Sequence, residues 1–430
     1  MIRKRVFQYG AALVFTRGIS FLFTLLIIRS LPIGDIGTYY FLIGISAVLE
    51  VFITWGSPVS IQTQSGKSEH SNMAFSAALL GAGLCFFSLI LFFFFQALHL
   101  IHDSLSPIAV IFVVSSTLVN SFTSIALAYY RSMLNVKNDI YILLAKELAK
   151  FVILLVIKSV FDLSLQSILV LLICINVLTI LSILIDLQIR KNKKELTIKK
   201  DISFLMKQGR LLMPTFFVYS FPFILIRIFG YTHFGKEATG LLNICLLTNA
   251  GFQLYASSWG MAVKPIIGHF NNLEDRSAIF KVWKETNWVY LSGCIVLYIV
   301  CFVCYKQVLG LFKLDADVAS VRHLYFIILL YNLVYSIGAI NNSFLQMLKL
   351  TGYELKGMRL GLLFYPLIIW YCFDKDIQTL AWAVVLLELF KLSVQEFVLY
   401  RRCELKPRYQ LSISAVVILI TGTITLICVF

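Results

Sequence analysis

Long apolar segments fill almost the whole of this 430-residue chain. A helix needs about 20 apolar residues to cross a bilayer core roughly 30 Å thick. Hydrophobic residues make up 59% of the chain and charged residues 14%, whereas a soluble domain has about half and about a quarter. Twelve stretches reach the spanning length: 7–30, 38–61, 73–98, 107–130, 140–160, 165–188, 208–229, 238–262, 286–305, 321–346, 357–373 and 377–400. They predict an all-α integral membrane protein with 12 transmembrane helices, and 411–430 is a candidate thirteenth.

The second half of the chain weakly repeats the first. The sequence Leu31-Pro-Ile-Gly-Asp-Ile-Gly-Thr-Tyr39 precedes the second segment, and Phe234-Gly-Lys-Glu-Ala-Thr-Gly-Leu241 precedes the eighth. Six helices followed by six similar helices predict two parallel bundles, and in such repeats the substrate path lies between the halves. The predicted domains are an N-terminal bundle, a basic linker, a C-terminal bundle, and a basic loop with an extra helix: 1–188, 189–207, 208–400 and 401–430.

The net charge of the chain is +15, and its basic residues are distributed as the predicted topology requires. With the N-terminus in the cytoplasm, 27 of the 37 Lys and Arg residues lie at cytoplasmic loops or helix ends, as the positive-inside rule requires. The densest group of basic residues consists of Arg190, Lys191, Lys193, Lys194, Lys199 and Lys200. We interpret it as an anchor on anionic lipid rather than as a nucleic-acid site. The first segment reads as a retained helix, because no small-residue cleavage site follows it.

Motifs for catalysis are missing from the sequence. It has no GxxxxGK[ST], no GxSxG and no HExxH, so neither ATP hydrolysis nor these hydrolase chemistries are indicated. Cys301 and Cys304 form a CxxC inside a predicted spanning helix, without a second pair, and they read as packing residues. The sequence therefore predicts a protein that is not an enzyme and that uses no cofactor or metal, with its energy supplied by a substrate or ion gradient or by a partner.

Two cations fall well inside the apolar segments. A charge near the centre of a spanning helix costs about 2.5–3.5 kcal/mol on insertion scales, so it should face a partner or a wet cavity. Arg17 lies ten residues into the first segment and is a candidate cavity-lining cation; a snorkelling or packing role is the alternative. Lys391 follows Glu388 at i, i+3, which puts both on one helix face, either as a neutralising structural pair or as cavity residues.

Further cations lie near the helix ends. Four at similar cytoplasmic depth are candidates for a basic vestibule that holds a phosphate group: Arg131, Lys146, Lys150 and Arg210. Ordinary positive-inside flanking is the alternative. Arg29 and Arg227 lie near the predicted outer ends of the first and seventh segments, against the topology rule. Because a guanidinium donates two parallel hydrogen bonds to phosphate, they are candidates for a lumen role.

Glu50 is an isolated carboxylate in the middle of the second segment. A carboxylate at membrane depth is a candidate for taking up and releasing a proton. Pairing with Arg17 or Arg29 is an equally weighted alternative. Pro214 and Pro222 predict a kink in the seventh segment, which suits either a helix that bends during transport or a static bend.

The chain resembles the Wzx-type polysaccharide flippases of the multidrug/oligosaccharidyl-lipid/polysaccharide exporter superfamily. The resemblance covers roughly residues 1–400 and rests on the six-plus-six helix count, the basic N-terminus, Arg131 at the end of the fourth segment and two motifs. The motifs are Arg29-Ser-Leu-Pro-Ile-Gly-Asp-Ile-Gly-Thr-Tyr39 and its echo Phe234-Gly-Lys-Glu-Ala-Thr-Gly240.

This resemblance implies two bundles around a cationic cavity in the bacterial cytoplasmic membrane. It implies transfer of an undecaprenyl-pyrophosphate-linked oligosaccharide from the inner to the outer leaflet, with a polysaccharide polymerase and a chain-length regulator as partners. Relatives often carry an acidic residue before the arginine of the seventh helix, where this chain has Ile226. The candidates for ion coupling in this chain are therefore Glu50 and Glu388. A multidrug exporter of the same superfamily, and a membrane glycan polymerase or ligase, are the alternative functions.

Overall fold

The computed structural model describes residues 2–63, 70–97, 106–132, 136–190, 198–247, 251–256, 259, 267, 276–315, 317–348, 350–372, 375–403 and 422. Throughout these ranges the regular elements are helices, so the predicted all-α membrane fold is confirmed. The proposed extra helix at 411–430 lies outside the described residues except for a single position.

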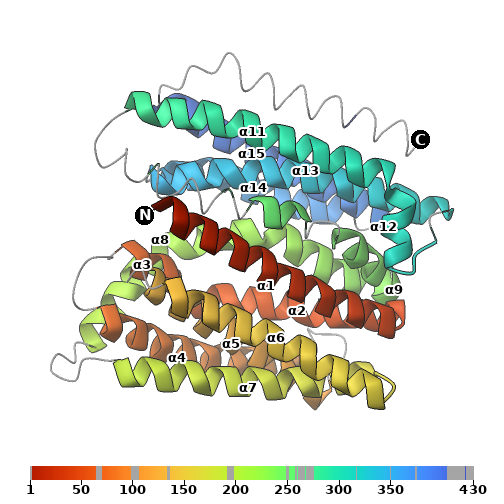
Figure 1. The fold of residues 1–430 in the computed structure, drawn as a ribbon, viewed down its shortest axis with the longest axis horizontal. Coiled ribbons are helices and arrows are strands. Elements are labelled where there is room, and N and C mark those ends of the chain that lie inside the picture. Colours follow the sequence, from red (N-terminus) through yellow and green to blue (C-terminus); the bar gives the residue numbers. More distant parts are fainter. Residues whose placement is uncertain are drawn as a thin grey trace. The chain divides into compact units, whose positions relative to one another are not determined.

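Each of the twelve predicted segments corresponds to one or more helices (Figure 1). Their bounds are α1 Ile2–Ser30, α2 Ile33–Thr54, α3 Ser57–Thr63, α4 His70–Ala97, α5 Pro107–Ser132, α6 Val136–Val160, α7 Leu165–Arg190, α8 Ile198–Ile224, η1 Leu225–Phe229, α9 Gly230–Leu246, α11 Arg276–Val303, α12 Tyr305–Leu311, α13 Ala319–Met347, α14 Thr351–Cys372 and α15 Ile377–Cys403. Within the described ranges, six helices are long and apolar enough to cross a membrane: α2, α5, α7, α11, α13 and α15. Helix α6 has a similar length but carries six charged residues, several of which form the candidate site.

Residue contacts divide the chain into two units. The N-terminal unit comprises the described residues of Gly18–Ile228, and the C-terminal unit comprises those of Met1–Arg17 and Phe229–Phe430. Helix α8 packs on α2 and α4 and so joins the N-terminal unit. The expected domain boundaries stay predictions. The predicted repeat of two six-helix bundles stays a prediction.

Helix α5 is the centre of the N-terminal unit, where it contacts α2, α3, α4, α6 and α7. It carries a run of small polar residues, and small side chains let neighbouring helices approach closely in a membrane. Thr117 Oγ1 donates to Ser46 Oγ on α2 at 3.1 Å, and Asn176 Nδ2 on α7 donates to Ser116 Oγ at 3.1 Å. These hydroxyl and amide groups therefore hold α2 and α7 to α5 where the hydrophobic effect does not act between helices.

Helix α13 has the same central place in the C-terminal unit and contacts α9, α11, α14 and α15. Side-chain to backbone hydrogen bonds tie α11 to it. The Tyr290 hydroxyl donates to the Ser336 carbonyl at 2.7 Å, and the Tyr325 hydroxyl donates to the Cys301 carbonyl at 2.9 Å. Cys301 and Cys304, near the C-terminal end of α11, are both free thiols and partly buried.

The second predicted segment is broken after Thr54, and the chain continues as the short α3. Trp55 and Gly56 both have positive φ angles, 46° and 70°, and a residue in this conformation ends a helix. The Trp55 indole donates to the Met206 carbonyl of α8 at 3.2 Å. A Cβ atom at Gly209 would lie 1.8 Å from Trp55 Cδ1 and 2.3 Å from the Trp55 carbonyl oxygen. Glycine at 209 therefore lets α8 lie directly on this turn.

We expect Gly209→Ala to lower the stability of the protein. The new methyl group would overlap the indole and the Trp55 backbone, and overpacking of this kind costs about 1–3 kcal/mol. Gly83→Ala in α4 is the matched control, because a Cβ there meets nothing within 4 Å. The apparent melting temperature in detergent micelles should fall for Gly209→Ala and stay the same or rise for Gly83→Ala. Equal melting temperatures would contradict the close approach.

The seventh predicted segment contains a π-helix, η1, at Leu225–Phe229. It begins three residues after Pro222, whose ring removes a backbone donor and disturbs the preceding turn. Isolated π-helical turns are frequently found at functional sites, and η1 carries Arg227. The expected kink at Pro214 stays a prediction.

Candidate functional site

The N-terminal unit contains a group of interacting charged and polar side chains, which we call the N-terminal polar cluster. Its members come from α1, α2, α5 and α6 and are Ser20, Glu50, Asn120, Lys146, Glu147 and Lys150. All six are only partly exposed. Polar groups at membrane depth are costly unless they are paired or serve a function, so this cluster is the first candidate for a substrate site.

A chain of side-chain interactions crosses three helices, from Lys146 through Asn120 to Glu50. The Lys146 ammonium donates to Asn120 Oδ1 at 3.2 Å, and the Asn120 side chain hydrogen-bonds to the Glu50 carboxylate. Lys146 also acts electrostatically on Glu50. The cation shown next to Glu50 is therefore Lys146, and a pairing of Glu50 with Arg17 or Arg29 stays a prediction. An amide that accepts from one ion and donates to the other can transmit a change between them.

Lys150 and Glu147 form the second part of the cluster. Lys150 Nζ lies 3.1 Å from Glu147 Oε1, and Ser20 on α1 also hydrogen-bonds to Glu147. The spacing of Lys146 and Lys150 places both on one helix face, as expected, and each acts electrostatically on the other. Glu147 relieves part of their repulsion from within the same helix.

Arg227 lies against α2 within the same unit. Its guanidinium carbon is 5.4 Å from the centre of the Tyr40 ring, a distance at which a cation is attracted to an aromatic face. A Cβ atom at Gly44 would lie 2.7 Å from Arg227 Cβ, so the absence of a side chain at Gly44 lets η1 approach α2. Arg227 and Glu147 both act electrostatically on Tyr39, which links Arg227 to the N-terminal polar cluster.

The C-terminal unit contains a second group, the C-terminal polar cluster, formed by Arg17, Tyr335, Glu388 and Lys391. Lys391 and Glu388 form the ion pair that their spacing predicts, and both are buried, with Glu388 only 1% exposed. Lys391 Nζ lies 5.3 Å from the centre of the Tyr335 ring. Arg17 also acts electrostatically on Tyr335, so both cations predicted deep in the membrane influence one tyrosine.

A buried hydrogen bond lies near this cluster. Gln395 Nε2 donates to Glu354 Oε1 at 2.8 Å, which joins α15 to α14. A Cβ atom at Gly338 on α13 would lie 3.2 Å from Gln395 Oε1 and 3.8 Å from Glu388 Oε1. The lack of a side chain at Gly338 therefore makes room for the polar face of α15.

The other sequence-predicted residues are not shown to join either cluster. Arg29 and Arg210 are exposed, and the side chain of Arg131 lies outside the described part of the structure. Sequence reasoning missed Asn120, Tyr40 and Tyr335, because a lone polar or aromatic residue in an apolar helix gives no sign of which charge it meets. Among the described residues, no group of three His, Cys, Asp or Glu side chains is placed to hold a metal ion.

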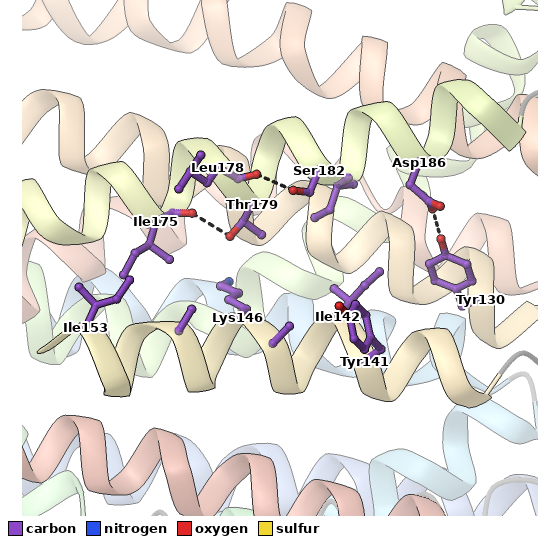
Figure 2. Close-up of a pocket in the computed structure, with 13 residues that line it drawn as sticks. Tyr130, Tyr141, Ile142, Lys146, Ile153, Ile175, Leu178, Thr179, Ser182 and Asp186 are labelled. Carbon is purple, nitrogen blue, oxygen red and sulfur yellow. Dashed lines mark hydrogen bonds between the residues drawn. The ribbon is translucent and has the colours of Figure 1, made fainter. Parts of the chain in front are cut away.

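A cavity of about 500 Å³ lies among α5, α6 and α7 beside Lys146 (Figure 2). Its lining is mostly apolar, with Tyr130, Thr179, Ser182 and Asp186 as further polar residues. The Tyr130 hydroxyl donates to Asp186 Oδ2. The N-terminal polar cluster can therefore be reached from an apolar space within its own unit.

Comparison with solved structures finds this fold in membrane transporters. The MATE multidrug transporter DinF-BH has a TM-score of 0.68 and 13% identity, covering 93% of this chain and 95% of that chain. The lipid II flippase MurJ in an inward closed conformation has a TM-score of 0.64 and 14% identity, covering 98% and 97%. A MOP superfamily transporter from Pyrococcus furiosus has a TM-score of 0.65 and 11% identity, covering 94% and 97%. The binding pocket of that transporter has reverse polarity.

No family model and no curated protein match the chain. The likeness to the solved structures extends over nearly the full length of both chains, but at such low identity it bears on the fold alone. The chain therefore has the fold shared by MATE transporters, other transporters of the MOP superfamily and the flippase MurJ.

Proposed function

We propose that this protein is a flippase for undecaprenyl-pyrophosphate-linked oligosaccharides in the bacterial cytoplasmic membrane. It moves repeat units from the inner to the outer leaflet by alternating access, for surface polysaccharide synthesis. Its N-terminus lies in the cytoplasm, and a polysaccharide polymerase and a chain-length regulator act with it. The observation that carries the proposal is the N-terminal polar cluster, with Arg227 beside it, inside a transporter fold.

The charge of this region suits an anionic head group. Lys146, Lys150 and Arg227 contribute three positive charges, and Glu50 and Glu147 contribute two negative ones. Hydrogen bonds from lysine or arginine to phosphate are stronger than neutral ones, and low dielectric strengthens them further. A site for cationic drugs would need an excess of carboxylates, which this group of residues does not have.

The connection from Lys146 to Glu50 suggests how binding is coupled to an ion. A phosphate group at Lys146 competes with Asn120 and Glu50 for the ammonium, so Glu50 loses stabilisation of its charge and favours the protonated form. Release of the phosphate reverses the change. Glu50 is therefore our candidate for proton coupling, and Glu388, paired with Lys391, is the second candidate.

The test is deletion of the gene in its host, followed by analysis of lipid-linked glycans on each face of the membrane. We expect repeat units linked to undecaprenyl pyrophosphate to accumulate on the cytoplasmic face, with loss of surface polysaccharide. Complementation with the intact gene is the control. Normal surface glycan with new sensitivity to cationic drugs would instead support a multidrug exporter, and unpolymerised units on the outer face would support a polymerase or ligase.

A further inference from the structure

The cavity among α5, α6 and α7 lies between two facing rows of side chains. On α6 the row includes Ala145, Ala149 and Ile153, spaced four residues apart, and on α7 it includes Ile175 and Thr179. Residues four apart share a helix face. Figure 2 shows Ile153 on α6 facing Ile175 on α7, with Lys146 in the space between the two helices. Because the alanine side chains on α6 are small, they leave space between the helices that larger side chains would fill.

The polar groups of this cavity differ in what they can offer an occupant. The Thr179 and Ser182 hydroxyls donate to carbonyls of their own helix, at 2.8 Å and 2.9 Å. Asp186 accepts from Tyr130. Lys146 has three N–H donors, and the hydrogen bond that the structure gives it goes to Asn120. The ammonium of Lys146 is therefore the strongest hydrogen-bond donor facing the cavity, and an anion is the group it would bind.

The cavity is open along an apolar rim. Tyr141 is 74% exposed, Leu178 is 64% exposed, and Ile153 is also exposed. All three belong to the lining. A protein with this fold meets hydrocarbon chains along its apolar helix faces. An occupant that satisfies both parts of the cavity is an amphiphile with a hydrocarbon chain and an anionic head.

We propose that this cavity, named here the α6–α7 cavity, binds the lipid-linked substrate by its first isoprenoid units and the adjoining phosphate. The isoprenoid lies between the rows of α6 and α7, and the phosphate accepts hydrogen bonds from Lys146. This inference rests on the proposed function and adds to it the place where the lipid is held. Because Lys146 also connects to Glu50, the same lysine links lipid binding to the candidate coupling residue.

The test measures binding of undecaprenyl pyrophosphate to the purified full-length protein by native mass spectrometry. Two variants fill the cavity from opposite walls, Ala149→Trp on α6 and Thr179→Phe on α7. Leu148→Trp is the matched control, because Leu148 is exposed on α6 and lies outside the lining. We expect both filling variants to weaken binding about tenfold or more, with Leu148→Trp unchanged. Lys146→Met should weaken binding by a similar factor, as expected for loss of charge-assisted hydrogen bonds.

Two further ligands identify which part of the lipid is recognised. Undecaprenol, which lacks phosphate, should bind at least tenfold more weakly than the pyrophosphate, and inorganic pyrophosphate should not displace the lipid. Wild-type affinity in both filling variants would overturn the cavity assignment, and so would displacement by inorganic pyrophosphate. Either result leaves the proposed function standing if gene deletion still abolishes export. Failure of the wild-type protein to bind the lipid, together with intact export after deletion, would overturn the proposed function itself.

Discussion

Replacing Lys146 by methionine is expected to abolish measurable glycan export while the protein still folds and inserts. Methionine keeps a long unbranched side chain but removes the ammonium that donates to Asn120 Oδ1 at 3.2 Å and acts on Glu50. Hydrogen bonds to charged groups contribute about 1.5–3 kcal/mol each, which corresponds to roughly a 10- to 100-fold loss for a single bond. The variant also loses the interaction between Lys146 and Glu50, so proton coupling is impaired together with substrate binding and the loss of export is larger.

The measurement is transport of a fluorescent lipid-linked oligosaccharide in proteoliposomes, with surface polysaccharide in the host as a second readout. Lys158→Met is the control, because Lys158 is an exposed lysine in the last turn of the same helix. Glu50→Gln should keep binding of the lipid and lose its dependence on the proton gradient. Full transport by Lys146→Met would contradict the assignment of the N-terminal polar cluster to the substrate path.

Replacing Lys391 by methionine is expected to give the largest loss of stability. The change leaves Glu388 in a buried position without the cation of its ion pair. Breaking a buried pair by removing one partner costs about 3–5 kcal/mol, whereas replacing both partners by apolar residues of similar size is often neutral. We therefore expect a marked fall in apparent melting temperature for Lys391→Met and recovery in the double variant Glu388→Leu, Lys391→Met.

An exposed ion pair in the same unit provides the comparison. Lys306 Nζ lies 3.1 Å from Asp317 Oδ1, with both side chains largely exposed, and water and salt screen such pairs. Lys306→Met should leave the melting temperature nearly unchanged. If Lys391→Met melted like wild type and the double variant gained nothing, Glu388 would not depend on Lys391 for its charge. Arg17, which acts on the same Tyr335 as Lys391, would then be the next residue to vary.

Local features of the sequence were sufficient for the class of fold. Twelve segments long enough to span a bilayer predicted helices, and each segment corresponds to a helix or a helix with a short extension. The ion pair of Glu388 and Lys391 was also predictable, because residues three apart on a helix always share a face. These correct predictions involve residues that are only a few positions apart in the sequence. At such short separations, helix geometry alone determines which side chains are neighbours.

The places where helices meet had to come from the tertiary structure. Asn120 lies 70 residues from Glu50 and 26 from Lys146, and nothing in its local sequence indicates that it connects the two. The break at Trp55 and Gly56 depends on a glycine in α8, Gly209, which lets that helix lie on the turn.

The sequence by itself therefore determined that this chain is a helical membrane protein with charges placed at membrane depth. The tertiary structure decided which charges share a cluster: Glu50 with Lys146, and Lys391 with Arg17 at Tyr335. The physical reason is that helix periodicity follows from local backbone geometry, whereas the pairing of buried charges depends on how helices pack. Packing is set by small residues and interhelical hydrogen bonds whose partners are distant in the sequence.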